Sequence, residues 1–139
     1  MRNDLRQILC EGDFSLVVDS GSVRTFSGKG VSDLLRLLDS EPDSLMGASL
    51  ADKVVGKAAA SLMVLAGVRE VYAEVISRPG LDMLRDVKID VAYDVLVGNI
   101  QNRTGTGLCP LERLCLPCAT PAECLGRIKG FINEMRKAN

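Results

Sequence analysis

The sequence predicts an α/β fold, specifically a three-layer α/β/α sandwich built around a mixed sheet. Two short apolar runs, separated by turn residues 19–22, indicate a β-hairpin near the N-terminus. After the hairpin, segments with helical spacing of apolar residues alternate with short apolar runs typical of buried strands. A hairpin supplies antiparallel strands and helix–strand alternation supplies parallel ones, so we expect a mixed sheet flanked by helices.

The N-terminal part is predicted to contain a helix, the hairpin and a second helix. Asn3 is placed to cap a first helix over about residues 4–10. The two hairpin strands cover residues 14–18 and 23–26. A second, amphipathic helix follows over about residues 31–40, and a proline directly after it prevents its continuation.

The most apolar stretch, residues 50–66, is predicted to form one buried helix. Apolar residues recur at every fourth position along it: Leu50, Val54, Ala58 and Leu62. Ser49 and Asp52 fit a capping box at its start, because their side chains can bind the free amides of a first helical turn. Gly67 is suited to end the helix.

The C-terminal part continues the alternation of strands and helices. A buried strand is predicted over residues 68–76, a short helix from Pro79 to about Asp86, and a further strand over residues 89–93. Residues 95–101 fit a helix and a strand equally well. A final helix begins at Thr120, which is followed by a proline and then by an acidic residue three positions after the cap.

Length, charge and composition limit the classes of function. The 139 residues fit one domain, 1–139, with a cysteine-containing helical tail from about residue 109. The net charge of −1 has no basic run behind it, and Trp is absent, so we expect no nucleic-acid partner. No stretch is long and apolar enough for a membrane span, and the charged N-terminus does not resemble a signal peptide. We therefore expect a cytoplasmic protein, and leave a homo-oligomer open.

Cysteines cluster near the C-terminus, and the chain has no histidine. Four of the five lie within sixteen residues: Cys109, Cys115, Cys118 and Cys124. Their spacing leaves three interpretations open, namely a zinc or iron–sulfur site, a redox dithiol, and thiols that only pack in the core. Without histidine, the usual catalytic base and the commonest nitrogen ligand of zinc enzymes are missing. No metal or cofactor is assigned from the residues.

Cys109 is the first candidate for a reactive group. It precedes Pro110 and stands three residues before Glu112, as the N-cap of another helix would. There its sulfur would face free backbone amides, which lower the pKa of a thiol. Asn102 and Arg103, in the glycine-containing loop before it, are candidates to hold a ligand. The alternative is a tight turn that carries a buried cysteine.

A second candidate group comprises Asp52, Lys53 and Lys57. If residues 50–66 are helical, the two lysines lie one turn apart and share a face with small residues that permit close approach of a ligand. Lysines near a helix start suit an anionic group, and a partly desolvated lysine can act as a base. The alternative is a solvated stripe on an otherwise buried helix.

Two stretches, residues 51–60 and residues 102–112, resemble the signature motifs of a prokaryotic family of domains of unknown function, family 1893. The resemblance implies a cytidine-deaminase-like fold, with a mixed sheet flanked by helices. Deaminases carry a His or Cys followed two residues later by Glu at one helix start, and a Pro-Cys-x-x-Cys motif at the next. Neither motif is present, so the resemblance implies this fold without the zinc centre and without zinc-dependent deamination.

These observations together predict that the protein binds a small polar or anionic metabolite. If it is an enzyme, it would also transform that metabolite. Cys109 would be the nucleophile, Asp52 or Lys53 would carry a proton, and Lys57, Asn102 and Arg103 would hold the ligand. The sequence leaves open whether the protein is an enzyme. The alternative is a non-catalytic module for assembly or sensing, whose C-terminal cysteines bind zinc or an iron–sulfur cluster.

Overall fold

The computed structural model describes residues 3–28, 30–102, 105 and 107–138, which form a mixed α/β structure. In chain order its elements are α1 (Asn3–Glu11), β1 (Leu16–Asp19), β2 (Val23–Phe26), α2 (Ser32–Ser40), the 3₁₀ turn η1 (Pro42–Ser44), β3 (Ser49–Val55), α3 (Lys57–Ala66), β4 (Glu70–Ser77), α4 (Arg78–Asp86), β5 (Asp90–Val97), α5 (Pro110–Cys115) and α6 (Pro121–Ala138). The hairpin and the helices predicted near residues 4–10, 31–40, 79–86 and 120 are confirmed. The ambiguous stretch after residue 94 continues β5 as far as Val97.

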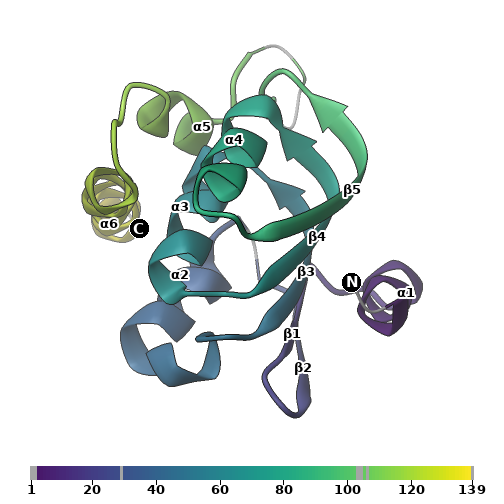
Figure 1. Ribbon diagram of the computed structural model, residues 1–139. Coiled ribbons are helices and arrows are strands. Elements are labelled where there is room, and N and C mark those ends of the chain that lie inside the picture. The colour runs from purple at the N-terminus through teal and green to yellow at the C-terminus, as the bar shows by residue number, and fades with distance from the viewer. Residues whose placement is uncertain (1–2, 29, 103–104, 106, 139) are drawn as a thin grey trace.

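The five strands lie in the order β2-β1-β3-β4-β5. β1 pairs antiparallel with both β2 and β3, whereas β3, β4 and β5 are parallel to one another. Figure 1 shows α1 alone on one side of this sheet and α2 to α6 on the other. The three layers are therefore unequal, since a single short helix forms one of them.

Each face of the sheet has its own apolar cluster. The larger cluster lies under α2, α3 and α4 and contains most of the buried leucines and alanines. The smaller one joins α1 to the sheet through five buried residues: Leu5, Leu9, Val17, Ala51 and Tyr72. Tyr72 also donates a hydrogen bond to Asp94, whose other carboxylate oxygen lies 3.1 Å from Arg6 Nη2 on α1. These polar contacts therefore help to fix the orientation of α1 on the sheet, in addition to its apolar contacts.

The single helix predicted over residues 50–66 is wrong. Ser49–Val55 forms β3, the middle strand of the sheet, and α3 begins only at Lys57. Ser49 and Asp52 therefore belong to a strand and form no capping box. β3 is buried on both faces at five of its seven positions, so its apolar residues do not alternate and their spacing fits a buried helix as well as a strand. The predicted end of α3 is confirmed, because Gly67 is its C-cap in the left-handed conformation, with φ 74°.

The starts of α3 and α4 lie against each other at the carboxyl ends of β3 and β4. A Cβ atom built on Gly80 would lie 3.0 Å from the carbonyl carbon and oxygen of Gly56 and from the oxygen of Val55. Only a residue without a side chain lets α4 approach the backbone so closely. The first turn of α3 is consequently enclosed by neighbouring segments.

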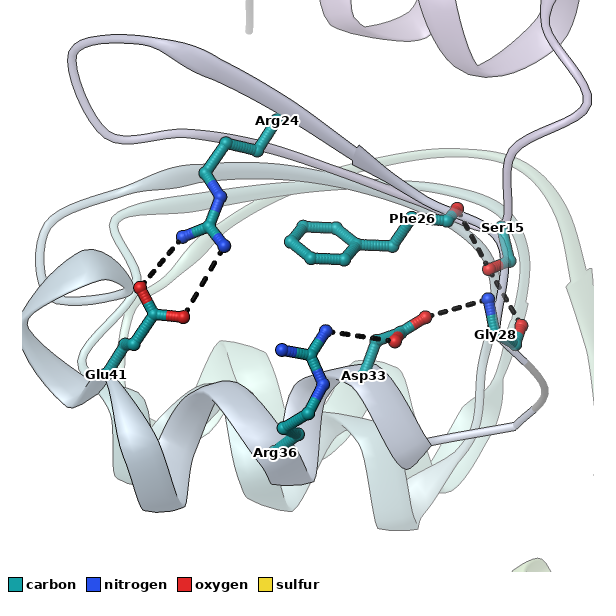
Figure 2. Close-up of polar contacts among 7 residues, drawn as sticks. All are labelled: Ser15, Arg24, Phe26, Gly28, Asp33, Arg36 and Glu41. Carbon is teal, nitrogen blue, oxygen red and sulfur yellow. Dashed lines mark hydrogen bonds and ion pairs between the residues drawn. The ribbon is translucent and has the colours of Figure 1, made fainter.

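A set of polar contacts attaches α2 to the hairpin (Figure 2). The Arg24 guanidinium on β2 donates to both carboxylate oxygens of Glu41 just after α2, at 3.1 and 3.4 Å. The Phe26 ring lies between Arg24 and Arg36, whose guanidinium carbons are 5.3 and 5.7 Å from the ring centre. Asp33 in the first turn of α2 accepts a hydrogen bond from the Gly28 amide at 2.8 Å. The start of α2 is thereby held beside β1 and β2.

The C-terminal helices α5 and α6 pack together and both contact α3. α6 begins as predicted, since the Glu123 amide donates to Thr120 Oγ1 at 3.2 Å. Within the described ranges, no helix combines the length and the apolar character that crossing a membrane requires.

Replacing Gly80 with alanine is expected to destabilise the protein by about 1–3 kcal/mol, because the added methyl group meets rigid backbone. Helix propensity acts in the opposite direction, by about 1 kcal/mol. Gly126→Ala is the matched control, since Gly126 is an exposed α6 residue with no atom within 4 Å of an added Cβ. Urea denaturation should show a lower midpoint for Gly80→Ala and an unchanged or higher one for Gly126→Ala. Equal midpoints in the two variants would contradict the close contact.

Candidate functional site

A cavity of about 160 Å³ lies where β3 passes into α3. Its apolar walls come from the segment before α2, from β3, from α3 and from the region around α5: Val31, Val54, Ala58, Ala59, Ile100 and Leu111. Four residues with ionisable side chains also line it: Asp52, Lys53, Cys109 and Glu112. The fold therefore brings together three of the predicted site residues: the neighbours Asp52 and Lys53, and Cys109, which lies more than fifty residues further along the chain.

Asp52 is the buried acid of the cavity. Its residue is 9% exposed, and burial raises the pKa of its carboxyl to about 7. The nearby backbone amides of Val54 and Lys53 lower this pKa, whereas the nearby charge of Asp33 raises it. In the described part of the chain no basic side chain forms an ion pair with Asp52. Both protonation states are therefore populated near pH 7, so the group can accept or donate a proton.

Lys53 follows Asp52 on β3 and also lines the cavity. Its backbone amide lies 3.1 Å from the Ser15 carbonyl oxygen of the neighbouring strand. Successive side chains of a strand point to opposite faces, so the side chains of Asp52 and Lys53 leave β3 in opposite directions. The role of Lys53 as a proton carrier stays a prediction.

Cys109 is the N-cap of α5, as predicted, and is partly exposed. Its amide donates to the Ile100 carbonyl oxygen at 2.8 Å, and its own carbonyl accepts from the Arg113 amide at 3.0 Å. The thiol makes no capping hydrogen bond. These backbone contacts hold Cys109 at the cavity with its sulfur not used as a cap, and the reactivity of that sulfur stays a prediction.

Glu112 is a site residue that the sequence analysis missed. It is 2% exposed, and its carboxylate accepts one hydrogen bond from the Lys57 amide at 2.8 Å and another from the Ile100 amide at 2.7 Å. The first of these amides begins α3, where a negative charge is favoured by the helix dipole. A Cβ on Gly56 would lie 3.1 Å from Glu112 Oε1, so the glycine leaves room for the carboxylate. The sequence around Glu112 indicates only an acidic residue in the first turn of its own helix. No sequence pattern near it indicates a contact with α3.

Lys57 is not on a helical face shared with Lys53, because Gly56 separates β3 from α3 and the two lysines belong to different elements. The Lys57 ammonium donates to the carbonyl oxygens of Leu116 and Cys118 at 2.9 and 2.7 Å. These bonds tie α3 to the end of α5. Lys57 is also absent from the residues that line the cavity, and its role as an anion anchor stays a prediction.

The predicted ligand-binding loop before Cys109 is only partly described. Asn102 forms a turn, in which its amide donates to the Gly107 carbonyl at 2.8 Å and its carbonyl accepts from the Gly105 amide at 3.1 Å. It lines a separate surface hollow together with Arg113 and Phe131. Arg103 lies outside the described residues.

The other cysteines of the C-terminal cluster lie apart from Cys109. Cys115, Cys118 and Cys124 are buried, and burial together with the neighbouring thiols raises the pKa of Cys115 to about 12. Burial likewise raises the pKa of Cys118. The thiols of Cys115 and Cys118 are therefore protonated at neutral pH, and a thiolate is the form that binds metals. Among the residues that the structure describes, no three Cys, Asp or Glu side chains are placed to hold a metal ion.

The chain is similar to known proteins over nearly all of its length. The model of a domain of unknown function, DUF1893, matches residues 4–132. The crystal structure of a DUF1893 family protein from Thermotoga maritima, TM1506, superposes with a TM-score of 0.84 at 27% sequence identity, covering 94% of this chain and 91% of that one. No curated protein matches the chain.

The raised pKa of Asp52 predicts a specific dependence of stability on pH. The folded protein holds the Asp52 proton up to about pH 7, whereas the unfolded chain loses it near pH 4. As the pH rises between these values, Asp52 therefore lowers the free energy of unfolding by about 1.4 kcal/mol per pH unit. Above about pH 7 the loss levels off. The asparagine of the Asp52→Asn variant does not titrate. The free energy of unfolding of the variant minus that of the wild type should therefore increase by up to about 4 kcal/mol from pH 4 to pH 7. Urea denaturation of both proteins at pH 4.5, 6 and 8 measures this difference, and a constant difference would contradict the burial of an ionisable Asp52.

Glu112→Gln is expected to destabilise the protein by about 2–3 kcal/mol, because an amide NH₂ would face one of the two backbone N–H donors that the carboxylate now satisfies. Glu123→Gln, at an exposed position in the first turn of α6, should change the free energy of unfolding by less than about 0.5 kcal/mol. Chemical denaturation at pH 7 compares the two variants. Equal losses would show that Glu112 has no special structural role.

Proposed function

The chain belongs to the DUF1893 family, and we propose that its members bind a small polar metabolite in the cavity between Asp52 and Cys109. The observation that carries this proposal is the Asp52 carboxyl, which is 9% exposed and faces no basic side chain among the described residues. Burying such a group is costly unless it gains partners. A ligand that hydrogen bonds to Asp52 would supply them, while the apolar walls enclose the rest of the molecule.

The chemistry of the cavity supports a thiol-based reaction on the bound molecule. Cys109 would add through its sulfur to a carbonyl carbon of the ligand, whose π electron pair moves to the carbonyl oxygen as the C–S bond forms. Asp52, with a pKa of about 7, would accept the thiol proton and pass it to that oxygen. Lys53 is the second candidate to carry this proton. Five unpaired cysteines favour a reducing location for this activity, and we place it in the cytosol.

The cytidine-deaminase-like fold belongs to the same proposal. In support of it, an antiparallel hairpin precedes parallel strands that alternate with helices, and the starts of α3 and α4 lie together near the cavity. Those helix starts read Gly56-Lys57-Ala58 and Arg78-Pro79-Gly80, without the His, Cys and Glu of zinc deaminases. Glu112 also fills the space beside the first turn of α3. The proposed reaction therefore uses a thiol in place of a zinc-activated water.

The volume of the cavity limits the ligand to a small molecule. A cavity of about 150 Å³ can hold benzene, so a volume of about 160 Å³ suits a body of roughly six to eight heavy atoms. This is well below the several hundred Å³ of typical cofactor sites. A nucleotide or a coenzyme would not fit without movement of the walls.

Alkylation of the two accessible cysteines tests whether this cavity binds ligands. Fragments of up to about eight heavy atoms are expected to slow the reaction of iodoacetamide with Cys109, because both would occupy the same cavity. Cys10, exposed on α1 on the other face of the sheet, serves as an internal control and should react at an unchanged rate. Peptide mass spectrometry measures both rates in one sample. Equal slowing at both cysteines, or none with any fragment, would contradict the proposal.

Cys109→Ser tests the proposed nucleophile separately from binding. The variant should keep its affinity for a protective fragment, measured by calorimetry, since serine differs from cysteine by one atom and leaves Asp52 and the apolar walls unchanged. It should lose the covalent adduct that an electrophilic analogue of that fragment forms with the wild-type protein, because a serine hydroxyl is a far weaker nucleophile than a thiol. An adduct of equal yield on the serine variant would rule out Cys109 as the nucleophile.

A further inference from the structure

The ionisable groups around the cavity have an uneven charge distribution. Asp52 and Glu112 both line it, and the charge of Asp33, in the first turn of α2, also disfavours ionisation of Asp52. The Glu112 carboxylate is compensated by two backbone amides and by the first turn of α3. Among the described residues, Asp52 has only the nearby amides of Lys53 and Val54 to favour its ionised form. The negative charge that lacks compensation therefore lies on Asp52.

Basic groups that would favour an anion are poorly placed. The Lys57 ammonium is bound to two carbonyl oxygens and does not line the cavity. Lys53 leaves β3 on the face opposite to the side chain of Asp52, as strand geometry requires. An anionic ligand in this cavity would meet Asp52 at close range, with no cation beside it among the residues that the structure describes. Like charges at such distances repel by several kcal/mol in a poorly solvated site.

On the basis of the proposed function, we infer that the ligand of this cavity is a small organic cation, an alkyl or cyclic primary amine, whose ammonium group binds Asp52. The three N–H donors of an ammonium suit a carboxylate oxygen, and the opposite charges compensate each other within the buried site. The hydrocarbon body contacts the apolar walls formed by Val31, Ala59 and Leu111. A neutral ligand could bind the protonated form of Asp52, but it would leave the charge of the ionised form without compensation.

Proton linkage makes this ligand class measurable. An ammonium binds the ionised form of Asp52, so the protonated fraction must lose its proton on binding. Other titratable or charged groups around Asp52 are Asp33 on α2, Lys53 on β3, Cys109 before α5 and Glu112 on α5. With Asp52 titrating near pH 7, the affinity for an amine should rise about 30-fold between pH 5.5 and 8.5, in proportion to the ionised fraction.

Three probes of at most eight heavy atoms that carry different polar groups test the inference: cyclohexylamine, cyclohexanol and cyclopentanecarboxylate. Isothermal titration calorimetry of the full chain at pH 5.5, 7 and 8.5 should give the tightest binding for cyclohexylamine, with proton release at pH 5.5 and 7. The carboxylate should bind at least tenfold more weakly than the amine at every pH. Tighter binding of the alcohol or the carboxylate would overturn the cationic ligand and leave the proposed cavity function standing.

Two variants test whether the preference for the amine and its dependence on pH come from Asp52. Asp52→Asn should lose the preference for cyclohexylamine over cyclohexanol and the dependence of affinity on pH. Asp94→Asn is the matched control, because it removes a carboxyl on β5 that binds Arg6 and Tyr72 and does not line the cavity. It should bind the amine like the wild type. If none of the three probes binds or protects Cys109 from alkylation, the proposed function fails together with this inference, whereas protection by cyclohexanol alone would overturn only the inference.

Discussion

The buried carboxylate of Glu112 is the interaction on which the arrangement of the site depends. It joins three segments that are distant in sequence, namely the start of α3, the chain after β5 and its own helix α5, through hydrogen bonds to the amides of Lys57 and Ile100. Each of these amides would otherwise be a buried donor without a partner, at a cost of about 1–3 kcal/mol. The same contacts bring Cys109 beside β3, because the Cys109 amide binds the carbonyl of Ile100.

Small residues make this arrangement sterically feasible. Gly56 leaves room for the Glu112 carboxylate, and Gly80 lets α4 approach the backbone that ends β3. Lys57 adds a second connection, since its ammonium binds two carbonyls at the end of α5. At the junction of α3 and α5, backbone amides thus pair with the Glu112 carboxylate, and backbone carbonyls pair with the Lys57 ammonium. The neighbouring cavity keeps one acid, Asp52, outside this network, which is why Asp52 remains available to a ligand.

The position of the cavity agrees with a general property of α/β proteins. Ligands commonly bind at the carboxyl ends of parallel strands, where helix starts and loops converge. The cavity lies at this end of β3, next to the point where the direction of pairing changes from antiparallel to parallel. The opposite face of the sheet, covered by α1, holds Tyr72 and Asp94 in contacts that attach the helix.

Local sequence patterns alone determined the hairpin, most helices and the mixed character of the sheet, because turn residues, caps and apolar spacing act over short distances. They also marked Asp52 and Cys109 as candidates. The boundary between β3 and α3 was not predictable, since burial on both faces removes the alternation that distinguishes a strand from a helix. Only the tertiary structure brought Asp52 and Cys109 into one cavity and gave Glu112 its role. These depend on contacts between residues more than forty positions apart, and burial, which raises the pKa of Asp52, is a property of the folded chain.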